Sequence, residues 1–196
     1  MTLRRARDRD EGPRRGAGGH ARLHGGDGRR GDHGGAMTGT LVIVRHAKAE
    51  NGDGDDHARR LTGKGRAQAQ AAGRLLAESG IVPDQVICST AARTRETLEL
   101  ALEQMPGRPS VDYEDAAYGA DDHTLFDLLN LVPKDVGTVM LVGHNPAVAQ
   151  MASSFVDTQV HGGYVAFPPA SVAVVGMEVE WLYAAPGTGS GRLLTA

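Results

Sequence analysis

The sequence predicts an α/β protein, a three-layer sandwich in which helices flank a mostly parallel central sheet. Two observations indicate this fold class. Short apolar runs rich in β-branched residues alternate with helix-sized amphipathic segments, the order typical of strand–helix–strand units. The first run, residues 41–44 (Leu-Val-Ile-Val), is apolar on both faces, as expected of a strand inside a sheet. A chain of 196 residues is long enough for one such domain.

The elements follow one another in a regular order. Strands are expected over residues 41–44, 85–88, 111–113, 138–142, 171–176 and 178–183, the last two forming a hairpin. Thr62 is a helix-capping residue and Gly80 a helix stop, which predicts a helix over 62–79. Further helices are expected over 91–104, from a cap at Asp122 to the residues before Pro133, and from Asn145-Pro146 onward.

The first 36 residues differ in composition from the rest. They hold nine Arg, no Lys, five acidic residues and ten Gly, so they carry about +4, whereas residues 37–196 hold 12 basic and 19 acidic residues, about −7. Residues 1–36 have too few apolar side chains to offset the entropy of ordering and are expected to be disordered. The predicted domain covers residues 37–185. Residues 186–196 are Gly-rich and are expected to form a flexible tail.

Residues 1–36 allow three interpretations. An Arg- and Gly-rich arm could bind nucleic acid through phosphate contacts. His20, His24 and His33 could hold a metal ion, although the surrounding glycines disfavour the helix that would align the first two. The favoured interpretation is a leader without function, with Met37 as the true start, because Met37 directly precedes the first strand. Nucleic acid is therefore not the expected partner.

The single cysteine, Cys88, excludes a disulfide framework and a cysteine zinc cluster, and it favours a reducing compartment. No apolar run approaches the roughly 20 residues of a membrane span, and the N-terminus lacks the apolar stretch of a signal peptide. We expect a soluble cytoplasmic protein with no membrane partner. The sequence does not determine its oligomeric state.

Polar side chains follow three of the expected strands. They are Arg45, His46 and Lys48 after the first, Ser89 and Arg93 after the second, and His144 and Asn145 after the strand over 138–142. Carboxyl ends of parallel strands meet at one edge of a sheet, so we expect one pocket. Two guanidinium groups and a helix N-terminus at Asn145 are typical of a phosphate site. The sequence has no P-loop, HExxH or paired-Asp motif, so no metal and no cofactor are expected.

These blocks resemble the signature of the histidine phosphatase superfamily. Residues 45–48 (Arg-His-Ala-Lys) resemble its Arg-His-Gly motif with Ala47 in place of Gly, residues 89–97 its S-x-x-x-R-x-x-x-T block, and residues 142–146 its second histidine block. The Ala47 variant and residues 167–171 (Phe-Pro-Pro-Ala-Ser) are most similar to the SixA-type phosphohistidine phosphatase branch. The resemblance spans residues 40–176 and implies a phosphoglycerate mutase-like fold.

The resemblance implies a mechanism through a phosphoenzyme. Neutral His46 would attack phosphorus and become phosphohistidine, which water then hydrolyses, while a carbonyl group holds its other ring nitrogen. The implied oxyanion-stabilising residues are Arg45, Arg93 and His144. The expected substrate-binding residues are Lys48, Ser89 and Asn145.

Larger superfamily members use a carboxylic acid to protonate the leaving alkoxide. Glu114 is the candidate acid here, and Tyr118, His123 and His161 could line the rim but are expected to be structural or solvated. Imidazole leaves without a strong acid, which favours phosphohistidine in proteins as substrate. Two alternatives remain: a phosphomonoesterase or mutase-like enzyme for small metabolites, and a non-catalytic phosphate-binding module in which the Cβ of Ala47 crowds the phosphate.

Overall fold

The computed structural model describes residues 38–52, 54–156 and 165–194. Six strands form one sheet in the order β3-β2-β4-β1-β5-β6. The strands are β1 (Gly39–Arg45), β2 (Gln85–Ser89), β3 (Ser110–Glu114), β4 (Thr138–Gly143), β5 (Val172–Met177) and β6 (Gly189–Leu194). The first four are mutually parallel, whereas β5 and β6 are antiparallel to their neighbours.

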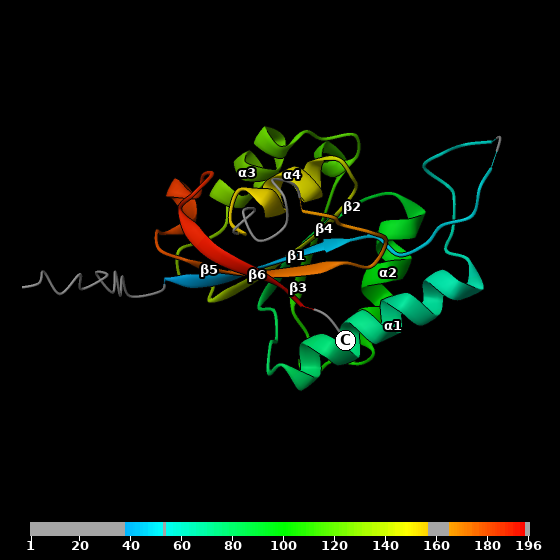
Figure 1. Cartoon of the computed structure of the whole chain (residues 1–196), viewed down its shortest axis with the longest axis horizontal. Coiled ribbons are helices and arrows are strands. Elements are labelled where there is room, and N and C mark those ends of the chain that lie inside the picture. Colours follow the sequence, from blue (N-terminus) through cyan, green and yellow to red (C-terminus); the bar gives the residue numbers. More distant parts are fainter. Residues whose placement is uncertain (1–37, 53, 157–164, 195–196) are drawn as a thin grey trace, which may run out of the picture. The chain divides into compact units, whose positions relative to one another are not determined.

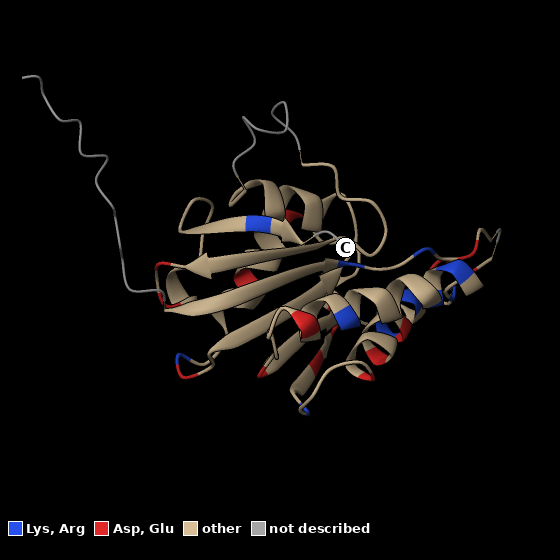
Figure 2. Cartoon of the chain, turned by 60° about the horizontal axis from the view of Figure 1, so that its bottom comes forward, with Lys and Arg blue, Asp and Glu red and all other residues tan. Residues whose placement is uncertain are grey.

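Helices cover both faces of this sheet. They are α1 (Gly63–Glu78), α2 (Ala92–Leu102), α3 (Asp122–Asn130) and α4 (Ala147–Ser153), with 3-10 turns η1 (Asp115–Ala117) and η3 (Trp181–Tyr183). Helices α1 and α2 lie on one face, and α3 and α4 lie on the other (Figure 1). Charged residues gather mainly on helices and loops (Figure 2). The predicted three-layer α/β architecture is confirmed.

The central strand β1 is buried on both faces, as its continuous apolar run predicts. Leu41 and Ile43 belong to the core under α3 and α4, whereas Val42 and Val44 belong to the core against α1 and α2. All four are at most 3% exposed. Burial of each such side chain contributes about 1.5–3 kcal/mol to folding, so β1 is an anchor shared by both cores.

Helix α1 starts and packs through residues that the sequence marks. The Thr62 side chain accepts a hydrogen bond from the Gly65 amide, as expected of its capping role. On the face toward α2, a Cβ on Gly73 would lie 2.3 Å from the Ala101 carbonyl oxygen, so only glycine permits this approach of the two helices. Helix α1 ends before Gly80, which has a positive φ of 69°.

Three expectations about the elements are wrong. The cap of α3 is Asp121 and not Asp122, because the Asp121 carboxylate accepts from the Thr124 amide. Residues 178–183 are not a strand. Trp181 instead turns into the core within η3 and donates its indole N–H to the Val136 carbonyl.

The expected flexible tail over 186–196 contains strand β6, the true partner of β5 in the hairpin. Its glycines are used for close packing: a Cβ on Gly189 would lie 2.7 Å from the Gly176 carbonyl oxygen, and the Gly191 amide donates to the Phe155 carbonyl. Glycine content alone therefore misled the prediction. The expectation of disorder for residues 1–36 lies outside the described residues.

Candidate active site

The carboxyl ends of three parallel strands meet at one edge of the sheet. Arg45, the last residue of β1, is in register with Gly143, the last residue of β4, and β2 ends beside them at Ser89. The two imidazoles that follow β1 and β4 are therefore neighbours, with 5.1 Å between the ring centroids of His46 and His144. The sheet topology brings together blocks that are far apart in the sequence, as predicted.

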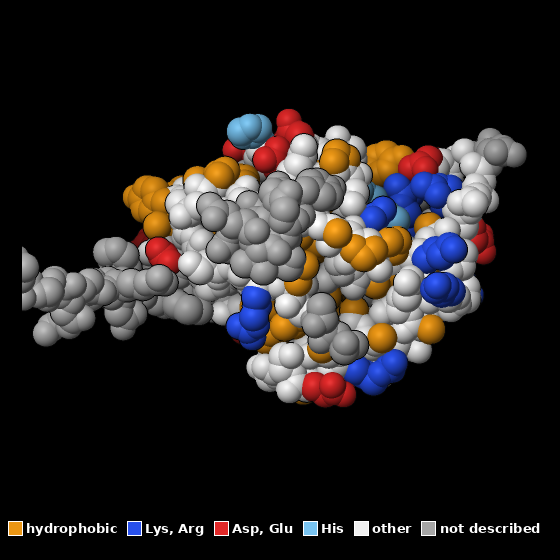
Figure 3. Space-filling view, viewed as in Figure 1, with side chains coloured by type: hydrophobic (Ala, Val, Ile, Leu, Met, Phe, Trp, Pro, Cys, Tyr) orange, Lys and Arg blue, Asp and Glu red, His pale blue; other side chains and the backbone are white. Residues whose placement is uncertain are grey.

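A cleft of about 370 Å³ opens at this edge. It is lined by six of the predicted site residues: Arg45, His46, Lys48, Arg93, His144 and Asn145. Four further lining residues were not predicted: Ala49, Asn51, Arg59 and Pro169. In the space-filling view, Lys or Arg side chains gather with His side chains around a hollow at the upper right (Figure 3). Basic groups around a recess are suited to holding an anion.

His46 lies in this cleft as a neutral imidazole. Its Nδ1 is 2.8 Å from the Ala47 carbonyl oxygen. A carbonyl only accepts, so Nδ1 carries the hydrogen and Nε2 keeps its lone pair. Burial lowers the pKa of His46 to about 4, with the Arg93 and Arg45 charges acting in the same direction and the Ala47 hydrogen bond opposing them. The expected carbonyl partner is confirmed, and this arrangement leaves Nε2 unprotonated at neutral pH.

Ala47 does not crowd the cleft. The residue is fully buried in a small cluster with Leu61 and Ala69. Its amide donates to the Thr97 hydroxyl at 3.0 Å, and that hydroxyl donates to the Arg93 carbonyl at 2.7 Å. Thr97 thus fastens the loop after β1 to helix α2, and the Ala47 side chain packs in the interior, which removes the reason for a non-catalytic module.

His144 is neutral as well. Its Nε2 is 2.8 Å from the hydroxyl of Ser89, which is fully buried. The Nδ1 atom is buried and has no hydrogen-bond partner among the described residues. Burial lowers the pKa of His144 to about 3, and the charge of Arg93 adds to this effect. Ser89 is therefore a support behind His144, which itself faces the cleft.

The segment before β5 holds the side of the cleft opposite α2. Because β5 is antiparallel, it starts at the carboxyl edge of β1, where Val44 pairs with Val172. The Phe167 carbonyl accepts from Arg45 Nη1 at 2.8 Å and from Asn145 Nδ2 at 3.1 Å. Nothing in the Phe-Pro-Pro-Ala-Ser pattern of residues 167–171 indicates that the Phe167 carbonyl has this anchoring role.

Arg93 enters the cleft from the first turn of α2, as predicted from its spacing to Ser89. Its side chain is 6% exposed. Nη1 donates to the Asp56 backbone carbonyl at 2.6 Å and Nη2 to the Asp56 carboxylate at 3.0 Å. Nε is buried and has no partner among the described residues. The guanidinium is thus held from the loop side and keeps donors for a bound anion.

The loop that is closed by the bridge between Ala49 and Leu61 carries two groups that the sequence did not predict, Asp56 and Arg59. Asp56 accepts from Arg59 Nε at 2.8 Å and from the Tyr118 hydroxyl at 2.9 Å, in addition to Arg93. The Tyr118 bond, then Arg59, lowers the pKa of Asp56 to about 2. The loop is rich in Gly and Asp, which is typical of solvated turns, and nothing in that pattern indicates ion pairing with a residue from α2.

Glu114, the candidate acid, is not in the cleft. It is still within the β3 ladder, paired with Ser89, and side chains of a strand point to the faces of the sheet and not along its edge. Glu114 therefore lines a separate hollow of about 150 Å³ together with Asp112 and Gln85. Its placement corrects the expectation that it acts on the leaving group.

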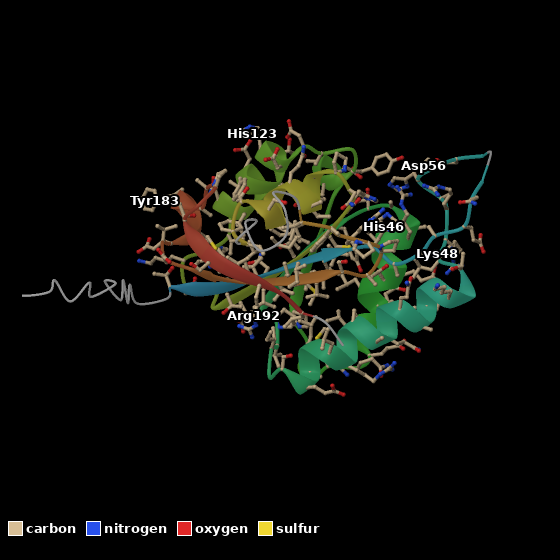
Figure 4. All side chains as sticks on the ribbon, in the orientation of Figure 1. His46, Lys48, Asp56, His123, Tyr183 and Arg192 are labelled. Atoms are coloured by element: carbon tan, nitrogen blue, oxygen red, sulfur yellow. The ribbon has the colours of Figure 1, made fainter. Side chains whose placement is uncertain are left out.

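Of the remaining candidates for the rim of the cleft, Tyr118 lies near the histidines and His123 does not. The centroid of the Tyr118 ring lies 5.7 Å from that of the His144 ring. Lys48 lies on the same side as His46 and Asp56, whereas His123 is far from them (Figure 4). His161 lies outside the described residues.

Among the described residues, no three His, Cys, Asp or Glu side chains form a group that could hold a metal ion, and no helix could span a membrane.

Known proteins give a consistent picture. The model of the Histidine phosphatase superfamily (branch 1) matches residues 41–117. The uncharacterized protein Rv1276c of Mycobacterium tuberculosis is 33% identical over 151 residues, which cover 74% of this chain and 93% of the relative.

Two solved structures, both assigned as the phosphohistidine phosphatase SixA, are similar to the chain. The structure from Nakamurella multipartitia is 29% identical with a TM-score of 0.65 and coverage of 79% of this chain and 92% of the other. The one from Agrobacterium tumefaciens is 27% identical with a TM-score of 0.67 and coverage of 82% and 97%. Together with the cleft described above, these likenesses show that the chain belongs to the SixA-type branch of the histidine phosphatase superfamily and is a phosphatase acting on phosphorylated substrates.

Proposed function

We infer that the chain removes phosphate from phosphohistidine in proteins, through a phosphoenzyme formed on His46 and without a metal ion. The observation that carries this proposal is the neutral His46 imidazole, held through Nδ1 by the Ala47 carbonyl, in a cleft lined by Arg45 and Arg93. In the first step the His46 Nε2 lone pair forms a bond to phosphorus. The bond to the leaving group breaks, and its electron pair departs with that group.

Charge builds on the phosphoryl oxygens during this transfer. The proposed stabilising groups are the guanidinium groups of Arg45 and Arg93 together with the His144 ring. Lys48 and Asn145, which also line the cleft, are the proposed substrate-binding residues, and Ser89 acts by supporting His144. A water molecule then attacks the phosphorus of phosphorylated His46 and restores the free imidazole.

The carboxylates near the cleft favour a nitrogen leaving group. No Asp or Glu is among the described residues that line the cleft, and the carboxylate nearest to Arg93, that of Asp56, is ionised above a pH of about 2. An alkoxide needs a proton to leave, and these groups do not supply one readily. The imidazole of a phosphohistidine whose other ring nitrogen carries a proton leaves as a neutral group.

We propose the cytoplasm as the place of action, because the one cysteine, Cys88, is unpaired and buried.

A competition between two substrates tests the proposal. The purified full chain is incubated with a phosphohistidine peptide and an alkyl phosphate monoester, and release of phosphate is followed for each. The peptide is expected to be cleaved faster. Faster cleavage of the alkyl ester would instead favour a general phosphomonoesterase.

The phosphoenzyme is tested in the same preparation with a labelled phosphodonor. The wild-type protein is expected to form an acid-labile, base-stable adduct, and His46→Asn is expected to form none. His123→Asn, the same change on the remote helix α3, serves as the matched control and should label like wild type. Labelling of His46→Asn at the wild-type level would show that another residue is the nucleophile.

A further inference from the structure

The carboxylate of Asp56 lies beside the cleft and is held by side chains from three parts of the chain, two of which, those of Arg59 and Arg93, line the cleft. Arg59 from its own loop donates to Oδ1, while Arg93 from α2 and Tyr118 after η1 donate to Oδ2. The Asp56 side chain is still 52% exposed. It is therefore a fixed negative charge with one side toward solvent.

This charge lies beside the reacting groups without belonging to the floor of the cleft. Figure 4 shows Asp56 on the loop side of His46. The Tyr118 ring, whose hydroxyl bonds to Asp56, is edge-on to the His144 ring at 5.7 Å. The charge of Asp56 acts to raise the pKa of His144, although burial and the charge of Arg93 outweigh it and lower that pKa to about 3. Asp56 is thus within electrostatic reach of a phosphoryl group placed between the two histidines.

Arg93 can bind a phosphoryl group and keep Asp56 at the same time. A guanidinium has five N–H donors, and the bonds to Asp56 use one on Nη1 and one on Nη2. The Nε–H is buried and without a partner among the described residues. The carboxylate can therefore stay in place during the reaction, and it need not be displaced by phosphate.

An in-line displacement places the leaving group on the side of phosphorus away from His46. We propose that Asp56 is a specificity-determining residue, whose fixed negative charge beside the cleft selects leaving groups that depart neutral, such as imidazole, over those that depart as anions. This inference rests on the proposed function and adds the group that discriminates between substrates.

The chemistry balances without an added reactant. When His46 Nε2 bonds to phosphorus, the P–N bond of a phosphoimidazole protonated at its other nitrogen breaks, and the electron pair returns to the ring. The ring is cationic in the substrate and still partly cationic in the transition state, so Asp56 attracts it there and raises kcat/KM relative to free enzyme and substrate. A phenolate or alkoxide gains negative charge as it leaves and is repelled by Asp56.

The experiment compares two small substrates in the full chain: phosphoimidazole, which leaves as neutral imidazole, and p-nitrophenyl phosphate, which leaves as an anion. The measured quantity is kcat/KM for phosphoimidazole divided by kcat/KM for p-nitrophenyl phosphate. Asp56→Asn is expected to lower the ratio about 3- to 10-fold, the range for one unit charge several ångströms away in a partly solvated site. Asp56→Ser removes the same charge and repeats the test if the first variant folds poorly.

Two matched variants separate charge from positioning. Asp55→Asn makes the same charge change on the neighbouring residue, which bonds the His57 amide and not Arg93, and should keep the wild-type ratio. Tyr118→Phe removes a hydrogen bond to Asp56 but keeps its charge, and should also keep the ratio. If Asp56 only positions Arg93, its loss lowers kcat/KM for both substrates equally, and the unchanged ratio overturns the inference.

Failure of the proposed function looks different. A wild-type protein that prefers alkyl phosphates to phosphohistidine peptides would contradict the proposed substrate. The effect of Asp56→Asn on the ratio of the two small substrates is still measured in that case. A lower ratio in Asp56→Asn would then still show that the charge of Asp56 discriminates between leaving groups, in a phosphatase that prefers other substrates.

Discussion

The two sides of the cleft are built in opposite ways. The side formed by the ends of β1, β2 and β4 carries imidazoles that burial keeps neutral, backed by Ser89 and the Ala47 carbonyl. The side formed by the loop after Ala49 carries an exposed carboxylate that its basic and hydroxyl partners keep ionised. Burial sets the protonation state on the first side, and hydrogen bonds set it on the second.

This difference separates two tasks. In the proposed mechanism the nucleophile must be unprotonated and the oxyanion-stabilising group must be held in place, and a strand end buried in two cores provides both. The proposed discrimination between leaving groups requires contact with solvent and incoming substrate, which a loop provides. Arg93 belongs to both sides, because it rises from α2 and is bonded to Asp56.

The largest effect is expected where the two sides meet. Arg93→Met removes a cation from the cleft and the anchor of Asp56, and kcat/KM is expected to fall about 10²- to 10³-fold, as for loss of a charged transition-state contact. Steady-state kinetics with a phosphohistidine peptide measures this. Arg95→Met, two residues along the same helix and stacked on Tyr113, is the matched control and should stay within about 3-fold of wild type. Equal losses in both variants would mean that α2 itself is disturbed.

A smaller effect is expected behind the buried side. Ser89→Ala removes the one hydrogen bond that the His144 ring makes among the described residues, so the ring loses its orientation and kcat is expected to fall about 10-fold. KM should change less, because Ser89 does not line the cleft. Ser110→Ala, at the exposed start of β3, is the control. A KM effect alone would assign Ser89 to substrate binding instead.

The neutral histidines also predict how stability depends on pH. Their folded-state pKa values of about 4 and about 3 lie below the ordinary value of 6.5, so the unfolded chain binds more protons between these limits. The free energy of unfolding is therefore expected to rise from pH 4 to 6.5 and to level off above, by roughly 1–2 kcal/mol per histidine after allowance for solvent. Urea unfolding at several pH values measures it.

Replacement of His144 by Asn should reduce that slope, because one proton-binding site is removed from the unfolded state. His123→Asn, which removes a histidine with no such burial, should leave the slope unchanged. Stability that instead increased as pH fell from 6.5 to 4 would show that the two rings are charged in the folded protein.

The smallest effect is expected from the loop alone. Arg59→Met removes the two donors to Asp56 Oδ1 but leaves Arg93 and Tyr118 in place, so the pKa of Asp56 should rise and kcat/KM should fall about 2- to 5-fold. A titration of the Asp56 carboxyl by NMR measures the shift. Arg74→Met, on the exposed face of α1, is the control. No shift of the Asp56 pKa would show that Arg59 and Asp56 do not pair in solution.

Most of the buried side could be predicted from the sequence, and little of the loop side could. The apolar runs mark the strands, and each strand end then fixes where Arg45, His46 and His144 lie. Asp56 has no such marker, because its partners Arg93 and Tyr118 are brought to it only by the tertiary fold.

Two further predictions were wrong for the same reason, that contacts made by the tertiary fold leave no local mark in the sequence. Glu114, the predicted acid, belongs to the β3 ladder and faces a hollow separate from the cleft. Strand β6 was taken for a loose tail, because close contact with β5 is a reason for glycine that composition does not reveal.

The position of β1 has a consequence for how the protein loses activity. The strand that directly precedes His46 is the one whose backbone is shielded by two cores and two neighbouring strands. Its amide hydrogens should exchange with solvent deuterium only through opening of the whole domain, whereas amides of the loop around Asp56 should exchange through local fluctuations. On heating, the substrate preference should consequently drift first, and the nucleophile should fail last, together with the fold.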